Sequence, residues 1–195
     1  MPSDRALIAA LTDAQRLGFL GDRHVSEVIA HARGFVRALE TDAAVRTVLD
    51  LGSGGGVPGL VIANDRPDLH VTLLDRRSKR TDFLERMVRR LGWSDRVDVV
   101  AAEVSAISGQ FDAVVARGFG PPAETARIAA GLVREGGSIV ISEPPDEDRW
   151  DDVLLAQLGL ERVPATLRDS PSPPSSAPSL EDRALEGRVA VFVRR

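Results

Sequence analysis

A glycine-rich turn at residues 48–59, Val-Leu-Asp-Leu-Gly-Ser-Gly-Gly-Gly-Val-Pro-Gly, constrains the fold of this chain more than any other segment. The turn follows a short apolar run and precedes a stretch with helical spacing, so it joins the end of a strand to the start of a helix. Glycines there allow positive φ and let the backbone approach a ligand, and the first N–H groups of the helix attract an anion or a carboxylate. The sequence therefore predicts a βα unit with a nucleotide-type cofactor site at the carboxyl end of its strand.

The segments around this turn alternate between strand and helix. Short apolar runs predict strands at residues 47–51, 70–74, 97–101, 111–116 and 138–142, and amphipathic stretches predict helices at 58–65, 78–91, 123–133 and 146–158. Strands that are separated by helices pair in parallel, with right-handed crossovers. We therefore expect an α/β fold with a mostly parallel sheet and helices on both faces.

The two ends of the chain depart from this alternation. Residues 1–46 show helical spacing, and we expect a helical cap in front of a domain that spans 47–195. Two further strands are predicted at 161–167 and 188–194. The Ser/Pro-rich segment 169–180 between them buries too little apolar surface to offset its ordering entropy, so a flexible loop is expected. Strands joined without a helix form an antiparallel hairpin, which would close a sheet of seven strands.

The glycine spacing fits two cofactor patterns. Counted from Asp50, the segment fits D-x-G-x-G-x-G, a pattern associated with S-adenosylmethionine. Counted from Gly54, it fits the dinucleotide pattern G-x-G-x-x-G. Both predict that Asp75, at the end of the second strand, accepts hydrogen bonds from ribose hydroxyls. The chain lacks a second mononucleotide-binding half, which favours the methyl donor over a nicotinamide cofactor; a turn without any ligand is the least favoured interpretation.

The composition excludes several functional classes. The 195 residues include no cysteine, so disulfides, thiolate zinc sites and cysteine nucleophiles are absent, and the three histidines are scattered, so no metal site is expected. The net charge of −4 argues against a protein held to nucleic acid by bulk positive charge. No apolar run approaches the roughly 18 residues of a membrane span, so we expect a soluble protein without membrane contact.

Two segments resemble a known family. Residues 50–84 read DLGSGGGVPGLVIANDRPDLHVTLLDRRSKRTDFL, with a Pro-Gly pair after the glycines and the pair Lys79-Arg80 after the Leu-Leu-Asp strand end, and residues 111–119 read FDAVVARGF. Both are similar to the small-subunit (16S) rRNA guanine-N7 methyltransferases, also called the glucose-inhibited division protein B family. The resemblance implies a class I, Rossmann-like methyltransferase fold, S-adenosyl-L-methionine as cofactor, a cytoplasmic location, and ribosomal RNA or the small ribosomal subunit as partner.

The resemblance also implies roles around the methyl donor. The glycine turn would contact the methionine end of the donor, Asp75 its ribose and residues 102–104 its adenine, while Asp50 orients the turn or reaches the donor amino group through water. The candidate cofactor-binding residues are Asp50, Gly52, Ser53, Gly54, Gly56, Pro58, Asp75, Arg76, Ala102, Glu103, Val104 and Arg117.

The acceptor side requires positioning rather than acid–base chemistry. The lone pair of guanine N7 is available at neutral pH, so no general base is needed and no catalytic residue is assigned. Arg117 and Phe119 follow the fourth strand, and Lys79 and Arg80 begin the basic segment 76–96; these four residues are the candidates for substrate contact. The basic segment is either a phosphate-contact surface or a solvated helix face with internal ion pairs.

Departures from the family pattern leave the acceptor open. The fifth strand ends in Ile-Ser-Glu143-Pro-Pro instead of the family's Leu-Lys-Gly, and acidic residues follow as far as Asp152. Acidic groups at that edge repel phosphates. The first prediction is an rRNA guanine-N7 methyltransferase. The alternatives are a methyltransferase that acts on a small-molecule metabolite and a non-catalytic donor-binding module, and the oligomeric state is not determined.

Overall fold

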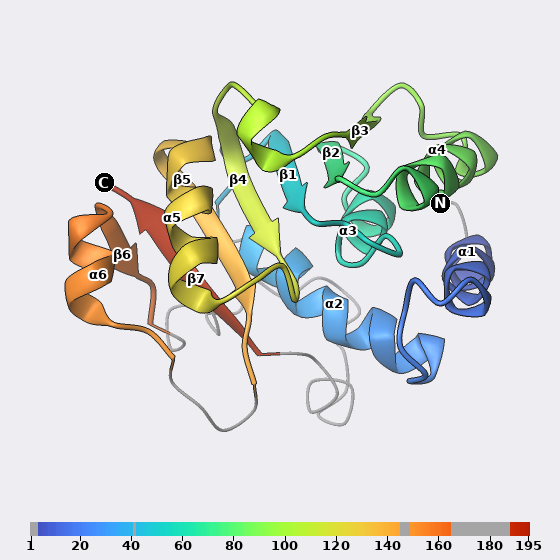
Figure 1. Ribbon diagram of the computed structural model, residues 1–195, viewed down its shortest axis with the longest axis horizontal. Coiled ribbons are helices and arrows are strands. Elements are labelled where there is room, and N and C mark those ends of the chain that lie inside the picture. The colour runs from blue at the N-terminus through green and yellow to red at the C-terminus, as the bar shows by residue number, and fades with distance from the viewer. Residues whose placement is uncertain (1–3, 41, 145–148, 165–187) are drawn as a thin grey trace.

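The computed structural model describes residues 4–40, 42–144, 149–164 and 188–195. Its strands are β1 (Thr47–Leu51), β2 (His70–Asp75), β3 (Val97–Ala101), β4 (Phe111–Ala116), β5 (Val133–Ser142), β6 (Leu160–Arg162) and β7 (Val189–Arg194). Within the described residues they form a seven-stranded sheet in the order β3-β2-β1-β4-β5-β7-β6 (Figure 1). β7 runs antiparallel to β5 and β6, and the pairs from β3 to β5 are parallel. The predicted mostly parallel α/β sheet with an antiparallel closing strand is confirmed.

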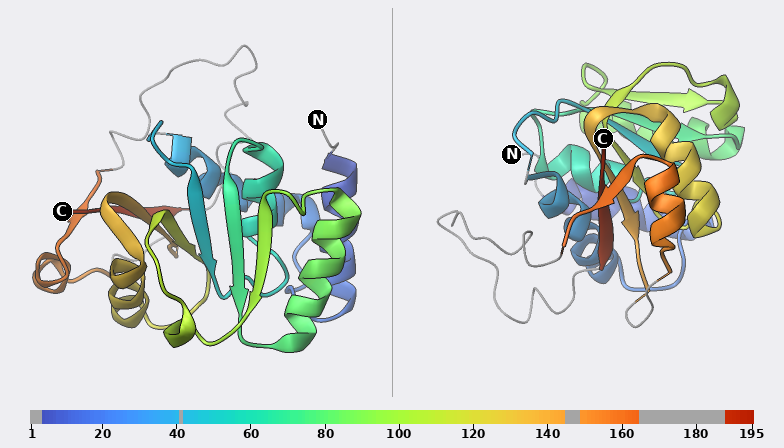
Figure 2. Two further views of the ribbon diagram at one scale, coloured as in Figure 1. Left: turned by 90° about the horizontal axis from the view of Figure 1, so that it is seen from above. Right: turned by 90° about the vertical axis from the view of Figure 1, so that its left-hand side faces the viewer.

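Helices cover both faces of this sheet (Figure 2). One face carries α1 (Asp4–Arg16), α2 (Val25–Glu40), α3 (Gly59–Asp65) and α4 (Ser78–Leu91), and the other carries α5 (Pro122–Leu132) and α6 (Asp152–Gln157). Consecutive side chains of β1 point to opposite layers: Val48 packs in the first apolar cluster and Leu49 in the second. A central strand that is buried on both faces is typical of parallel sheets.

The strand order places a ligand crevice beside β1. The chain moves outward from β1 through β2 to β3 and then returns to β4 on the other side of β1. At such a switch point the loops after the two central strands separate, and ligands of doubly wound sheets bind at the carboxyl ends of the strands there. The glycine turn follows β1 directly, so it lies at this position.

The fifth strand is longer than its sequence pattern predicts. It begins at Val133 instead of residue 138, because Val133 pairs with Phe111 before the register shifts and Ala113 pairs with Ser138. Gly137 lies at this irregularity, where a Cβ atom would be 2.7 Å from the carbonyl oxygen of Asp112. The glycines in 133–137, which weaken a strand pattern, thus permit a close approach of two backbones.

The C-terminal elements differ from their predicted bounds. The helix predicted at 146–158 begins at Asp152, because the Asp151 carboxylate accepts hydrogen bonds from the backbone N–H groups of Val153 and Leu154, at 2.8 and 3.3 Å, and so caps the helix. β6 ends at Arg162. The last part of the strand predicted at 161–167 and the loop predicted at 169–180 lie outside the described residues.

The two N-terminal helices share the core of the sheet. Leu7 and Leu11 of α1 and Phe35 and Leu39 of α2 are fully buried in one cluster with the strands. Their connection reaches the glycine turn, since a Cβ atom on Gly55 would lie 2.6 Å from Cγ of Leu20. The connection between the helices therefore contacts the turn, and the role of residues 1–46 as a cap stays a prediction.

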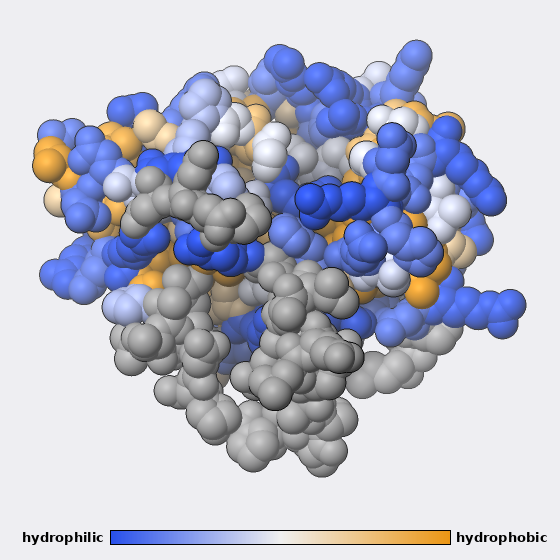
Figure 3. All heavy atoms as spheres, turned by 90° about the horizontal axis from the view of Figure 1, so that it is seen from below, coloured by the Kyte–Doolittle hydropathy of each residue, from blue (hydrophilic) through white to orange (hydrophobic). Residues whose placement is uncertain are grey.

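Hydrophilic side chains cover much of the face that Figure 3 shows, with smaller apolar patches between them. The large apolar side chains that are exposed include Leu17, which is 52% exposed at the end of α1, and Val153, which is 66% exposed on α6. None of the helices in the described ranges combines the length and the apolar character of a membrane span.

Candidate functional site

A cavity of about 530 Å³ opens at the carboxyl ends of β1, β2, β3 and β4. Its volume lies within the roughly 300–1,000 Å³ of small-molecule sites. The lining residues are Gly52, Leu74, Asp75, Arg76, Arg77, Arg80, Ala102, Glu103, Val104, Gly118, Phe119, Gly120, Pro121, Glu124 and Ile128. The cavity therefore lies where the strand order predicts a ligand site.

The glycine turn forms one wall through close backbone packing. Gly52 and Gly54 have φ values of 69° and 56°, in the left-handed region that favours glycine. The N–H of Ser53 donates to the carbonyl of Leu74 at 2.9 Å, which ties the turn to β2. A Cβ atom on Gly52 would lie 2.8 Å from Cδ2 of Phe119. The Phe119 ring thus lies against the backbone of the turn and leaves no room for a side chain at position 52.

Asp75 ends β2 and presents a buried carboxylate to the cavity. It is 5% exposed. Its Oδ2 accepts from the N–H of Gly54 at 3.0 Å and its Oδ1 from the N–H of Arg77 at 2.9 Å. Nη1 of Arg80 lies 3.3 Å from Oδ2. A carboxylate accepts about four hydrogen bonds, so this group is held in a fixed orientation and keeps acceptor capacity for a ligand hydroxyl.

Asp50 supports the turn from behind. Its Oδ2 accepts from the N–H of Gly59 at 3.0 Å, which links β1 to the start of α3. Its Oδ1 is buried and has no hydrogen-bond partner among the described residues. Burial raises the pKa of Asp50 to about 7, although hydrogen bonds from the turn and the charge of Arg117 oppose this rise. A carboxyl with this pKa and one unsatisfied oxygen is suited to a cationic or hydrogen-bond-donating ligand group.

The segment after β3 supplies a wall with both apolar and polar groups. Ala102 and Val104 are half-buried and pack against the second apolar cluster, and Val104 begins the short helix η1 (Val104–Ala106). Nη1 of Arg76 lies 3.3 Å from Oε1 of Glu103, an exposed pair that connects the ends of β2 and β3. An apolar slot with polar groups at its rim suits a planar heterocycle.

Arg117 is placed next to the glycine turn but is not among the residues that line the cavity. Its Nε donates to the carbonyl of Val57 at 3.3 Å, which links the end of β4 to the turn. Burial lowers its pKa, against the opposing charge of Asp50. Burial also lowers the pKa of His31 on α2, and the nearby charges of Arg117 and Arg23 lower it further. Several basic groups therefore gather behind the turn, outside the cavity wall.

The structure divides the predicted cofactor residues into two groups. Gly52, Asp75, Arg76, Ala102, Glu103 and Val104 line the cavity. Asp50, Ser53, Gly54, Gly56, Pro58 and Arg117 belong to the turn and its supports and are not part of the lining. Their direct contact with a ligand stays a prediction.

The substrate candidates are also separated. Phe119 lines the cavity, and Arg80 lines both the cavity and a neighbouring groove at the start of α4. Lys79 is exposed and lines the groove, not the cavity. Arg80 therefore lies between the two spaces, while Phe119 and Lys79 face different ones.

One wall of the cavity was missed in the sequence. The loop after β4 and the first turns of α5 contribute Gly118, Gly120, Pro121, Glu124 and Ile128. A signal was present, because Phe119 is followed at once by the Pro-Pro start of a helix, and the first turn of that helix must border the carboxyl end of β4.

Glu143 follows β5 and is buried away from the cavity lining. It accepts a hydrogen bond from Nε1 of Trp150, and Nη2 of Arg162 lies 3.9 Å from its Oε2. Trp150 in turn packs edge-on against Phe192 of β7, with ring centroids 4.7 Å apart. The negative charge at the position of the family's lysine is therefore balanced inside the protein and not presented to a ligand in the cavity.

The fold and the cavity together define a class I S-adenosylmethionine-dependent methyltransferase fold. Solved structures with this fold include the S-adenosylmethionine-dependent methyltransferase SibL, with a TM-score of 0.61 and 18% identity, covering 96% of this chain and 69% of that chain. Another is an O-methyltransferase family protein from Burkholderia thailandensis, with a TM-score of 0.57 and 17% identity, covering 82% of this chain and 54% of that chain. At these identities the likeness concerns the fold alone.

Within that class, the chain belongs to the family GidB, rRNA small subunit methyltransferase G, which it matches over residues 8–146. Similar proteins named ribosomal RNA small subunit methyltransferase G occur in Neisseria meningitidis serogroup A, 40% identical over 111 residues (56% of this chain, 53% of the relative), and in a Nocardioides species, 49% identical over 77 residues (38% of this chain, 30% of the relative). The resemblance found in the sequence is confirmed. The chain spans about half the length of the Neisseria relative.

Proposed function

We propose that this protein transfers a methyl group from S-adenosyl-L-methionine to N7 of a guanine in small-subunit (16S) rRNA, in the cytoplasm. The observation that carries the proposal is the buried Asp75 carboxylate, held by two backbone N–H groups at the edge of a cavity at the switch point of the sheet. Membership of the GidB family supports the choice of an rRNA acceptor.

The cavity fits the chemical groups of the methyl donor. Asp75 keeps acceptor capacity for a ribose hydroxyl beside the three donors that it already has. The half-buried Ala102 and Val104 offer an apolar slot for adenine. Gly52 lines the cavity, and its backbone would contact the methionine end. The unsatisfied Oδ1 of Asp50 has no partner among the described residues, and a donor amino group, reached through water, would satisfy it.

The chain contributes positioning to the reaction. The donor supplies an electrophilic methyl group on a sulfonium sulfur, and guanine N7 attacks with a lone pair that needs no prior deprotonation. Phe119 and the wall from α5 exclude water and limit the directions from which a base approaches. Alignment of nucleophile, methyl carbon and sulfur can lower the barrier by up to about 10 kcal/mol. No residue is therefore required to act as a general base.

RNA is the acceptor class that the neighbouring surface supports. Phe119 offers a ring on which a base can stack, and Arg80 and Lys79 supply positive charge beside the cavity. Contacts to phosphates fix the register of an RNA strand, whereas contacts to bases select the nucleotide. Arg117, behind the turn, is proposed to support the turn and the acceptor side together.

The direct test is a map of N7-methylguanosine in small-subunit rRNA. Deletion of the gene removes one such modification, and the purified protein restores it on RNA from the deletion strain when the donor is added. The variant Asp75→Asn serves as a control with impaired donor binding. Complete methylation in the deletion strain contradicts the proposal.

A small-molecule acceptor is the second candidate, and Glu103 and Glu124 at the cavity favour it because acidic groups repel phosphates. Methyl transfer to a metabolite extract, in the absence of RNA, would identify this function. Donor binding without transfer to RNA or to metabolites would identify a non-catalytic donor-binding module.

A further inference from the structure

A groove of about 550 Å³ lies next to the donor cavity. One side is the segment that follows α1, with Leu17, Gly18 and Phe19, and the other is the start of α4, residues 76–80. Arg76, Arg77 and Arg80 line both the groove and the cavity. A chain that occupies the groove therefore leads directly to the donor site. We call this space the basic groove.

Among the described residues, carboxylates balance only part of the positive charge in the basic groove. Arg76 pairs with Glu103 and Arg80 with Asp75, both at 3.3 Å. Arg77 and Lys79 are exposed and form no ion pair within the described residues. Asp82, one turn further along α4, pairs with neither of them. Two cationic side chains are thus free to bind an anionic partner.

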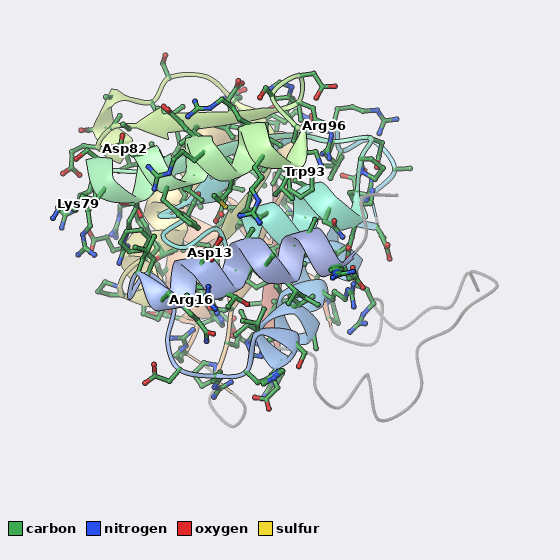
Figure 4. The ribbon with its side chains drawn as sticks, turned by 90° about the vertical axis from the view of Figure 1, so that its right-hand side faces the viewer. Asp13, Arg16, Lys79, Asp82, Trp93 and Arg96 are labelled. Carbon is green, nitrogen blue, oxygen red and sulfur yellow. The ribbon has the colours of Figure 1, made fainter. Side chains whose placement is uncertain are left out.

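The other half of α4 differs in this respect. Arg89 lies 3.6 Å from Glu85, and Arg90 lies 3.0 Å from Asp13 of α1. Arg96 lies over the Trp93 ring at 5.1 Å. Figure 4 shows Lys79 at one end of α4, near the end of α1 that carries Arg16, whereas Trp93 and Arg96 lie at the opposite end. Arg86 and Arg96 also form no ion pair within the described residues, but they line neither the groove nor the cavity. The unpaired charge beside the donor cavity is therefore that of Arg77 and Lys79.

The basic groove also has an apolar side. Leu17 is 52% exposed, an unusual exposure for a leucine beside arginines. Phe19 is held in place by an edge-on contact with Phe83 of α4, with ring centroids 5.6 Å apart. An acidic peptide loop would contact only the arginine and lysine side of the groove. An RNA strand can contact both sides, because it presents phosphates together with sugar and base faces.

We propose that the basic groove holds the sugar–phosphate backbone of the acceptor RNA immediately next to the nucleotide that is methylated. Arg77 and Lys79 contact phosphates, and Leu17 packs against a sugar or a base. This inference rests on the proposed function, and it adds a binding site for the strand that flanks the target base.

The test compares the double variant Arg77→Gln/Lys79→Gln with the matched control Arg89→Gln at the other end of α4. The full-length protein methylates protein-free small-subunit rRNA from the deletion strain, and KM for RNA is measured against salt concentration. We expect KM of the double variant to rise about tenfold, and the slope of log KM against log salt to fall by about 1.4, which is two phosphate contacts at roughly 0.7 each. The control variant should change kcat and KM for RNA by less than about twofold and keep the wild-type salt slope.

A second variant separates the apolar contact from the charges. Leu17→Ser keeps every charge and changes an exposed side chain, so the fold is retained. We expect KM for RNA to rise about threefold with an unchanged salt slope, because no counterion release is lost.

The outcomes distinguish the groove from the proposed function. If the wild-type protein methylates RNA and the double variant keeps its KM and salt slope, the groove proposal is wrong and the proposed function stands. A control variant that loses as much affinity as the double variant also overturns it. If the double variant is impaired only on assembled subunits, the groove binds a ribosomal protein and the RNA proposal is wrong. A wild-type protein that methylates no RNA overturns both.

Discussion

Two buried carboxylates, Asp75 and Asp50, lie on either side of the glycine turn and have different hydrogen-bond partners. Asp75 accepts from two backbone N–H groups and lies beside an arginine, so its charge is stabilised at the cavity wall. Asp50 is 1% exposed, accepts from Gly59 and retains one unsatisfied oxygen. These partners support the proposal that Asp75 binds the donor and that Asp50 maintains the shape of the turn.

The variant Asp75→Asn tests the ribose role. It keeps the shape of the side chain but loses its charge and part of its acceptor capacity. The loss of hydrogen bonds to a charged group costs about 1–3 kcal/mol, so donor affinity measured by calorimetry should fall roughly tenfold to a hundredfold. The control is Asp98→Asn. Asp98 is an exposed carboxylate on β3 that pairs with His70, and this variant should bind the donor with wild-type affinity. Equal affinity of Asp75→Asn and wild type would contradict the role.

The pKa of Asp50 predicts a pH dependence of stability. The pKa rises from 3.8 in the unfolded chain to about 7 in the folded one because of burial. Between these values the folded protein holds a proton that the unfolded chain has lost. The contribution of Asp50 to stability is therefore complete below about 3.8 and decreases as the pH rises to about 7, by at most about 1.4 kcal/mol per pH unit.

The variant Asp50→Asn isolates this contribution, since the amide does not titrate and its oxygen can still accept from Gly59. The free energy of unfolding of the variant, relative to wild type, should increase as the pH rises from 4 towards the Asp50 pKa of about 7. Urea unfolding at several pH values measures it. If the difference in the free energy of unfolding between variant and wild type is constant over this range, the pKa of Asp50 is not raised and the prediction is wrong.

At the level of elements, the first residue of α3 connects the helix to β1 and β2. A Cβ atom on Gly59 would lie 2.2 Å from Cδ2 of Leu73 and 2.5 Å from Oδ2 of Asp50. The helix can begin this close to the sheet only without a side chain. The same closeness brings the N–H of Gly59 to the Asp50 carboxylate and so fixes the end of the turn.

Gly59→Ala should therefore destabilise the protein by about 1–3 kcal/mol, because an added methyl group forces the helix away from the sheet. Gly131→Ala, in α5, has open space around the added Cβ atom and should be neutral or stabilising by up to about 1 kcal/mol. Thermal or urea unfolding compares the two. If both substitutions change the free energy of unfolding by a similar amount, the close contact of Gly59 with Leu73 and Asp50 does not determine the stability of the protein.

At the level of the molecule, the donor cavity draws on the ends of four strands and on α5. A ligand that binds there bridges elements that are distant in the chain and binds the folded state only. It therefore raises the free energy of unfolding in proportion to the logarithm of its concentration.

S-adenosyl-L-methionine at 100 times its dissociation constant should stabilise the protein by about 2.7 kcal/mol. Scanning calorimetry with and without the donor measures this effect. A nicotinamide dinucleotide at the same concentration is the control for the second glycine pattern and should produce no shift. A shift with the dinucleotide and none with the methyl donor would reverse the assignment of the cofactor.

Much of the donor site could be inferred from neighbouring residues in the chain. The apolar periods of two and of 3.6 residues, the glycines after β1 and an acid at the end of β2 are local signals, and each reflects backbone conformation or the alternation of side chains. They predicted the α/β fold, the turn and the position of Asp75. The Pro-Pro start of α5 was an overlooked signal for the first turn of the β4–α5 wall, whereas Ile128, further along the helix, has no local pattern that separates a cavity wall from a helix face.

The sequence alone thus determined the order of strands and helices along the chain, the position of the glycine turn and the family. These depend on short-range conformational preferences and on motifs of contiguous residues. Long-range packing decided the rest. It placed Phe119 against Gly52, turned Arg117 towards Val57 and brought Leu17 opposite Arg77. Each of these contacts joins segments far apart in the chain, and their meeting is set by how the helices fill the two faces of the sheet.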